Sequence, residues 1–152
     1  MSNTNDDSLM EYYERFPSVL KKALKENKVR FFPNLCKEYQ PIEVYRSVRI
    51  VKNIKEVITK EDFYSQVERD LPGVDKDDIG NYSCSCFETI EEIWDRLHYP
   101  KKNKKIAKGV IYDNEGPIAK DKGSTHIHWF LYDGVDPSDR FEVINYEKVD
   151  NS

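Results

Sequence analysis

Two of the three histidines in the chain lie two residues apart in a β-prone, aromatic run at residues 125–132. Alternation along a strand places His126 and His128 on one face, and a strand beside a loop rich in Asp, Gly and Pro at residues 133–139 suits a ligand or metal site. The opposite face of this strand receives three apolar side chains: Ile127, Trp129 and Leu131. We expect both histidines to be at least partly accessible and the apolar residues to be buried against helices.

Two cysteines with the same period-two spacing, Cys84 and Cys86, lie in a second strand-like segment at residues 82–87. If this strand neighbours the histidine strand, four ligands suited to tetrahedral zinc converge on one face. Alternatively, both cysteines are small residues of the core, because strand pairs lack the turn or helix spacing of common zinc sites. A third interpretation makes a cysteine the nucleophile of a triad with a histidine and Asp133 or Asp136, although such thiols usually lie at turns or helix ends.

Polar residues in three strand-like segments form another group. They are Tyr45 and Arg46 in the strand expected at residues 43–51, Ser83 and Ser85 in the cysteine segment, and Glu142 in the last strand, expected at residues 141–148. This group resembles the ADP-ribosyltransferase superfamily, in which an arginine on an early strand, a serine on a central strand and a glutamate on a late strand surround the nicotinamide end of NAD. The resemblance covers these three short segments and implies a split sheet with NAD in its cleft.

The resemblance also implies roles for individual residues. Arg46 would hold phosphate by bidentate, charge-assisted hydrogen bonds, Ser83 or Ser85 would orient the ribose and nicotinamide, and Glu142 would stabilise the cationic sugar. In the same cleft, His128 would join Ser85 and Glu142 as a catalytic residue. Two further residues would complete the cofactor-binding group: Tyr45 and His126. The alternative interpretation is that all of these are polar residues on a solvated sheet face.

The bulk composition excludes some classes of function and leaves others open. A formal net charge of −4 argues against general nucleic-acid binding, and the lysine-rich run at residues 101–105 is interpreted as a solvated loop rather than a phosphate contact. Acidic clusters at residues 75–78 and 88–92 favour a different class, an inhibitor or immunity-type module that covers a basic partner. The expected partner is therefore either a small-molecule nucleotide or a basic protein surface.

The sequence predicts a cytoplasmic protein. No apolar window reaches the ~20 residues that a bilayer-spanning helix needs, and residues 2–8 are polar and acidic where a signal peptide is basic and then apolar. The odd cysteine count, three, fits a reducing compartment.

The fold class predicted from these patterns is α+β, with residues 1–8 as a disordered tail and residues 9–150 as a single domain. Apolar spacing over residues 9–27 predicts a helical N-terminal arm that breaks near Pro17. Capping signals at Thr59 and Thr89 predict later helices. Short turns between the strands of the last third predict a C-terminal meander in a mostly antiparallel sheet covered by helices.

Overall fold

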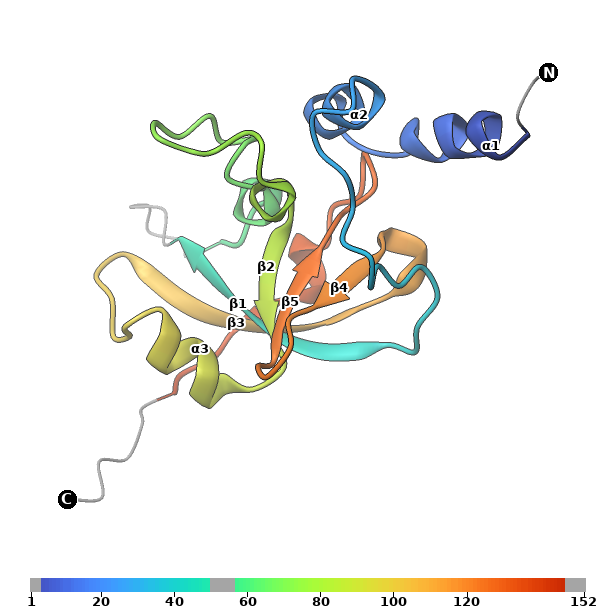
Figure 1. Cartoon of the computed structure of the whole chain (residues 1–152). Coiled ribbons are helices and arrows are strands. Elements are labelled where there is room, and N and C mark those ends of the chain that lie inside the picture. The colour runs from blue at the N-terminus through green and yellow to red at the C-terminus, as the bar shows by residue number, and fades with distance from the viewer. Residues whose placement is uncertain (1–3, 50–56, 147–152) are drawn as a thin grey trace.

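The computed structural model describes residues 4–49 and 57–146, and its centre is a six-stranded sheet (Figure 1). All neighbouring strands are antiparallel, in the order β4-β5-β2-β1-β3-β6. The strands are β1 (Ile42–Arg49), β2 (Cys84–Phe87), β3 (Lys104–Ile111), β4 (Ile118–Lys120), β5 (His126–Trp129) and β6 (Glu142–Val143). The α+β class is thus confirmed. The ends of the predicted strands at residues 50–51 and 147–148 lie outside the described residues, as do residues 1–3 of the predicted tail.

The predicted C-terminal meander is wrong. β3 pairs along its whole length with β1 on one side and at two positions with β6 on the other, whereas β4 pairs with β5 and, by an isolated bridge, with Cys36. β3 and β1 both have eight residues and β4 has three. Because β1 is as long as β3, it satisfies more of the backbone hydrogen-bonding groups of β3 than the short β4, the next strand in sequence, could.

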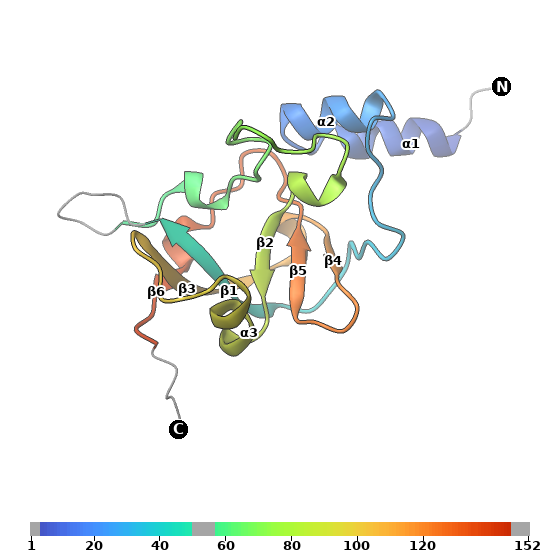
Figure 2. The ribbon, with the colours of Figure 1, turned by 60° about the vertical axis from the view of Figure 1, so that its left-hand side comes forward.

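Three α-helices accompany the sheet in the described residues: α1 (Thr4–Tyr13), α2 (Ser18–Lys25) and α3 (Ile90–Arg96). α1 begins within the segment expected to be a disordered tail, and the predicted break falls between α1 and α2, where Pro17 is the N-cap of α2. α1 and α2 lie at one end of the sheet, and α3 lies at the opposite end (Figure 2). None of the described helices is both long and apolar enough to cross a membrane.

The helix expected after Thr59 is a single 3-10 turn, η1 (Lys60–Phe63). Thr59 and Asp62 do form the predicted capping box, but Tyr64 is already extended, with φ −71° and ψ 143°. Oδ1 of Asp62 also accepts a hydrogen bond from the backbone N–H of Arg49 at 2.9 Å, which fastens this turn to the end of β1. A second 3-10 turn, η2 (Ile79–Tyr82), leads directly into β2.

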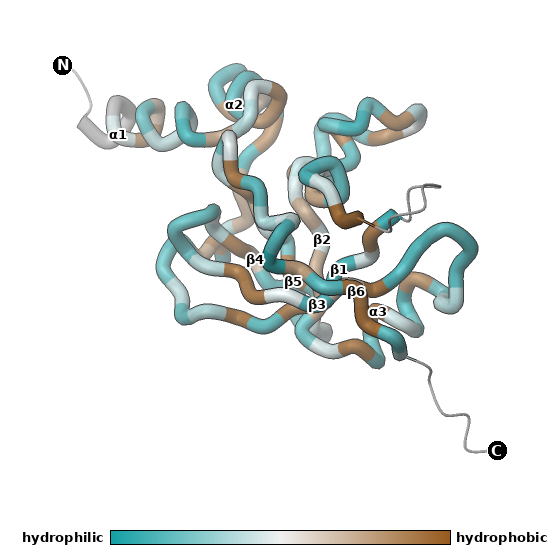
Figure 3. The backbone as a smooth tube through the Cα atoms, turned by 180° about the vertical axis from the view of Figure 1, so that it is seen from behind, coloured by the Kyte–Doolittle hydropathy of each residue, from teal (hydrophilic) through white to brown (hydrophobic). Residues whose placement is uncertain are grey.

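The core occupies both faces of the sheet. Ile127 and Trp129 are fully buried on one face, where they pack with neighbouring strands and with the rings of Phe63 and Phe141. Part of the expected helical cover is present, because Val19 and Leu20 of α2 line a narrow hollow with Trp129 and Leu131. The η1 turn contributes Phe63 to the same face, and Leu131 follows the strand and is half-buried. In the hydropathy view, hydrophobic segments recur along the strands, while the connecting loops are largely hydrophilic (Figure 3).

β1 and β2 are neighbours, yet one register pair joins them, Tyr45 with Phe87. Beyond this pair the two strands splay apart (Figures 1 and 2). The side chain of Arg46, 8% exposed, fills the opening: its Nη1 donates to the carbonyl of Ser85 at 2.7 Å, and its Nε and Nη2 donate to the carbonyl of Asp62 at 3.1 and 3.0 Å. A side-chain hydrogen bond from Arg46 to Ser85 thus takes the place of backbone hydrogen bonds between β1 and β2 where the two strands separate.

Candidate functional site

A cleft of about 370 Å³ opens where β1 and β2 splay apart. The strands of the sheet supply its floor, and the η2 turn and the loop before β3 supply its sides. Its cationic, hydroxyl and imidazole lining residues are Arg46, Ser47, Tyr64, Arg69, Ser83, Ser85, Lys101, Lys104, His126 and His128. The cleft therefore combines groups that bind anions with groups that transfer protons or hold metals.

The two histidines share one face of β5, as predicted, and their side chains are 11% and 13% exposed. Their ring centroids are 4.4 Å apart. The ring of Phe87 lies 5.0 Å from that of His126, and the ring of Phe32 lies 4.8 Å from that of His128. Aromatic packing on both sides holds the two imidazoles in place.

Both imidazoles hydrogen-bond to one carboxylate, that of Asp121. Nδ1 of His126 lies 2.7 Å from Oδ2, and Nε2 of His128 lies 3.0 Å from Oδ1. The other nitrogen of each ring meets a serine: Nε2 of His126 bonds with Oγ of Ser85, and Nδ1 of His128 lies 3.1 Å from Oγ of Ser83. All four imidazole nitrogens thus have a side-chain partner.

These contacts shift the ionisation of the group. Partial burial alone would raise the pKa of Asp121, but the hydrogen bond from His126 and the nearby His128 outweigh it and lower that pKa. Burial, followed by the neighbouring His126, lowers the pKa of His128, and Asp121 only partly offsets this. At neutral pH Asp121 is therefore ionised and His128 is neutral.

Sequence reasoning missed Asp121, although the sequence contains a signal for it. Asp121 follows β4 directly, and Gly123 lies in the turn before β5 with a φ of +75°. In such a hairpin the last residue before the turn lies opposite the first residue after it, and the backbone N–H of Asp121 donates to the carbonyl of His126 at 3.1 Å. An aspartate beside the histidine pair was thus predictable from the turn.

Of the two alternatives for the cysteines, the zinc set of Cys84, Cys86, His126 and His128 is wrong, and the interpretation of both as core residues is confirmed. β2 does pair with β5, but the register sets Ser85 opposite His128, and the two cysteines opposite Ile127 and Trp129. Cys84 and Cys86 therefore point to the other face, where they are 2% and 0% exposed and belong to the core. A shift of one residue in register reverses every side chain of a strand, which is why the two pairs do not converge. The same geometry excludes either cysteine as a nucleophile beside these histidines.

Four cationic side chains approach the cleft: those of Arg46, Arg69, Lys101 and Lys104. Burial, then the neighbouring Lys101 and arginines, lower the pKa of Lys104, and burial, then Arg46, lower that of Arg69. Nε of Arg69 is also buried without a hydrogen-bond partner among the described residues. Asp78 is the one carboxylate in this lining, and its Oδ1 accepts the N–H of Gly80 at 2.9 Å.

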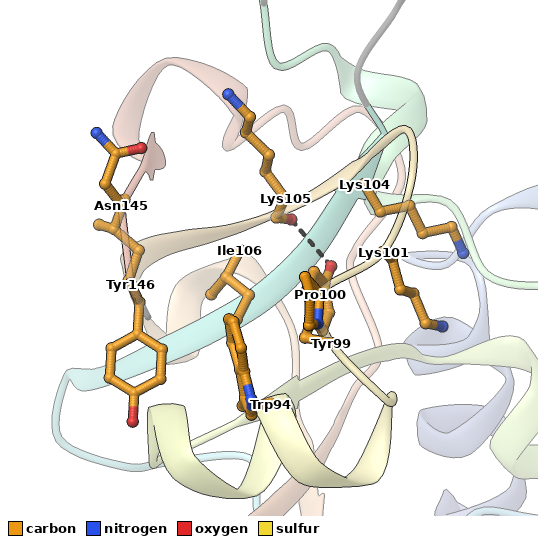
Figure 4. Close-up of a pocket in the computed structure, with 10 residues that line it drawn as sticks. Trp94, Tyr99, Pro100, Lys101, Lys104, Lys105, Ile106, Asn145 and Tyr146 are labelled. Carbon is orange, nitrogen blue, oxygen red and sulfur yellow. Dashed lines mark hydrogen bonds between the residues drawn. The ribbon is translucent and has the colours of Figure 1, made fainter. Parts of the chain in front are cut away.

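Lys101 lies in the turn before β3 and Lys104 is the first residue of β3; both belong to the run at residues 101–105 that was interpreted as a solvated loop. Tyr99 anchors this turn: its hydroxyl donates to the carbonyl of Lys105 at 3.2 Å and also hydrogen-bonds with Ser47 of β1 (Figure 4). Arg49 at the end of β1 lies directly opposite Lys104 in the register. The turn is therefore part of the cleft rather than a detached loop.

A second hollow, an aromatic groove of about 560 Å³, adjoins the cleft. Its apolar lining comes from Trp94, Tyr99, Ile106, Ile144 and Tyr146. Lys101 and Lys104 line both hollows, and their amino groups point away from Trp94 and Tyr146 (Figure 4). The two lysines thus form a ridge with an aromatic side and a cationic side.

Two predicted site residues lie away from the cleft lining. Glu142 is exposed on β6, opposite Lys108, and two strands, β1 and β3, separate β6 from β2. Tyr45 packs with the cluster beneath α3 that contains Phe87 and Tyr99. The structure therefore brings Arg46, Ser83, Ser85, His126 and His128 together, and leaves Tyr45 and Glu142 outside.

Comparison of the chain with models of known protein families, with curated proteins and with solved structures gave no match.

Proposed function

We propose that the protein binds a small phosphate-bearing molecule of the nucleotide class in the cleft between β1 and β2. The observation that carries this proposal is the convergence of four cations around one opening. Within the described residues, none of these four lies in an ion pair with a carboxylate. A bound phosphate would supply the missing negative charge by charge-assisted hydrogen bonds.

The cations have different roles in this proposal. Arg46 is nearly buried and spends its donors on two backbone carbonyls, so it contributes charge and fixes the strand of Ser85. Arg69 retains an unsatisfied donor, and the pKa of Lys104 is lowered by burial and then by the neighbouring cations, so its charged form is disfavoured. Arg69, Lys101 and Lys104 are therefore the residues expected to contact phosphate.

The aromatic groove supports a nucleotide rather than a simple phosphate. Trp94 and Tyr146 are half-exposed rings with their centroids 5.3 Å apart, beside the lysine ridge. A base or nicotinamide ring can stack on such side chains while its phosphates reach the cations. NAD and ADP-ribose belong to this class, in keeping with the resemblance to ADP-ribosyltransferases, although Glu142 lies outside the cleft.

The competing proposal, an acidic module that covers a basic protein, has less support in the geometry. Several of the carboxylates in the two acidic clusters serve the fold itself. Asp75 and Asp78 accept backbone N–H groups in their own turns, and Glu92 accepts the N–H of Thr125 at 3.1 Å with each oxygen. These three carboxylates therefore have a role in the fold that accounts for their presence without a partner protein.

The proposal is tested by calorimetric titration of the protein with ADP-ribose, NAD, ADP and inorganic phosphate. We expect ADP-ribose or NAD to bind more tightly than phosphate, and Lys104→Met to weaken binding by about tenfold, the cost of one charge-assisted hydrogen bond. Lys108→Met is the matched control, because Lys108 lies on the same strand and pairs with Glu43 outside the cleft. Equal affinity in the two variants, or no binding of any of these compounds, would contradict the proposal.

A further inference from the structure

We infer that Asp121, His126 and His128 form a three-ligand site for a divalent transition metal, with zinc as the best-suited ion. Each residue offers one ligand atom, and the three atoms all lie within 4.8 Å of one another. The ligands of a tetrahedral zinc ion, with bonds of about 2.0–2.1 Å, are roughly 3.3 Å apart. The carboxylate oxygens lie 2.7 and 3.0 Å from the two imidazole nitrogens, so small side-chain movements would admit the ion.

The surroundings of the two imidazoles match those of metal ligands. A ligating histidine uses one nitrogen for the metal, while a hydrogen bond to the other fixes the ring and its tautomer. Here Ser85 holds Nε2 of His126 and Ser83 holds Nδ1 of His128, so both remaining nitrogens face Asp121. Ser85 lies on β2, where the strand pairing with β5 sets its position, and Ser83 lies just before β2 as the C-cap of η2.

The backbone above His128 adds to this preorganisation. A Cβ atom on Gly80 would lie 3.3 Å from Cε1 of His128, so a side chain at this position would press on the imidazole and the η2 turn packs closely over it. With Phe32 on the ring as well, His128 has little freedom to turn away from Asp121. The site is therefore held by residues that do not themselves bind the metal.

The ligand set is that of a catalytic metal rather than a structural one. Structural zinc sites close the coordination sphere with four protein ligands, whereas catalytic sites use three and leave a position for water or substrate. No fourth histidine, cysteine or carboxylate joins the group within the described residues. The side chain of Asp121 is 42% exposed, which gives the ion a route from solvent.

This inference does not depend on the proposed nucleotide binding, because the two use different residues. The alternative for two of these residues is a relay from Ser85 through His126 to Asp121, in the order of a serine nucleophile triad. The metal site is favoured because Asp121 serves two imidazoles in equivalent ways, and a triad needs only one. The two interpretations differ in their response to zinc. A metal site predicts zinc-induced NMR shifts at the imidazole nitrogens that face Asp121, whereas the relay predicts none.

The test is a titration of metal-free, full-length protein with zinc chloride, followed by calorimetry and by NMR of the imidazole nitrogens. We expect one ion per chain, with zinc-induced shifts at Nδ1 of His126 and Nε2 of His128. Asp121→Asn should weaken binding at least tenfold, and Ser85→Ala should weaken it 10- to 100-fold, the usual effect of losing a supporting hydrogen bond.

Two controls separate this site from incidental binding. His98→Asn removes the remaining histidine and should leave the zinc affinity unchanged, and so should Lys108→Met, because Lys108 pairs with Glu43 outside the cleft. Circular dichroism of each variant checks that it is folded. An unchanged affinity in folded Asp121→Asn, shifts confined to His98, or no binding at all would overturn the inference.

Discussion

Five polar side chains form a continuous hydrogen-bonded chain across the floor of the cleft. It runs from Ser85 through His126, Asp121 and His128 to Ser83. Since each histidine has a partner at both nitrogens, neither ring can flip without breaking two hydrogen bonds. This arrangement keeps polar groups at defined positions beside four cations, which is the kind of preorganisation that a binding site needs.

Lys104 shows that the cleft is kept at a cost to stability. It lies opposite Arg49, and like charges directly opposite one another destabilise a sheet. We expect Lys104→Met to raise the free energy of unfolding at neutral pH in phosphate-free buffer, because the variant removes a charge that burial and neighbouring cations disfavour. Thermal and urea unfolding of the variant, compared with Lys108→Met, measure this effect. A destabilised variant would contradict it.

The extra unfolding free energy expected for Lys104→Met should depend on pH, because the pKa of Lys104 is lowered in the folded protein. Between that pKa and the unfolded value of ~10.4, the unfolded chain binds more protons than the folded one, so stability of the unsubstituted protein rises with pH in this window. The variant lacks this rise. The advantage of Lys104→Met should therefore shrink as the pH approaches ~10.4. A difference that stays constant from neutral to alkaline pH would exclude charge repulsion as its cause.

At the scale of elements, local patterns predicted more than pairings did. Alternation alone set His126 and His128 on one face, and capping residues correctly located the start of α3 at Thr89. The register between β2 and β5, which decides whether serines or cysteines meet the histidines, depends on packing across the sheet. So does the pairing of β1 with β3 that brings Lys104 beside Arg49. Neither the β2–β5 register nor the β1–β3 pairing can be predicted from the residues of one strand alone.

An ion pair joins two turns of the chain: Glu115 lies in the turn after β3, and Arg140 lies in the turn before β6. Arg140 donates to both carboxylate oxygens of Glu115, at 2.7 and 2.6 Å, and these hydrogen bonds to a buried carboxylate raise the pKa of Arg140. We expect Arg140→Met to lower the free energy of unfolding by about 1–3 kcal/mol, because Glu115 would stay buried without its partner.

A double-mutant cycle in urea measures the interaction between these two residues. Adding Glu115→Gln to Arg140→Met should cost much less than the sum of the single changes, since the second change removes the charge that the first left unpaired. Strictly additive losses would show that the pair contributes no coupling energy, and that the turns are held by other contacts.

At the scale of the whole molecule, the charge that lines the cleft is opposite in sign to the net charge of the chain. The chain carries a formal charge of −4, yet four cations and a single carboxylate line the cleft in the described residues. A local positive potential in an acidic protein attracts small anions while the overall charge repels polyanions such as nucleic acids. This distribution fits a site for a small phosphate-bearing ligand and explains why bulk charge alone did not reveal it.

The salt dependence of binding tests this distribution. We expect the affinity for ADP-ribose to fall as the ionic strength rises from 0.05 to 0.5 M, conditions over which the Debye length shortens from roughly 14 to 4 Å. The fall should be less steep in Lys104→Met, because that variant has one cation fewer to be screened, and it should be unaltered in Lys108→Met. Isothermal titration at matched pH with sodium chloride supplies the measurement. An affinity that does not change with salt would mean that the cations stabilise the split sheet rather than a ligand, and it would leave the aromatic groove as the principal binding surface.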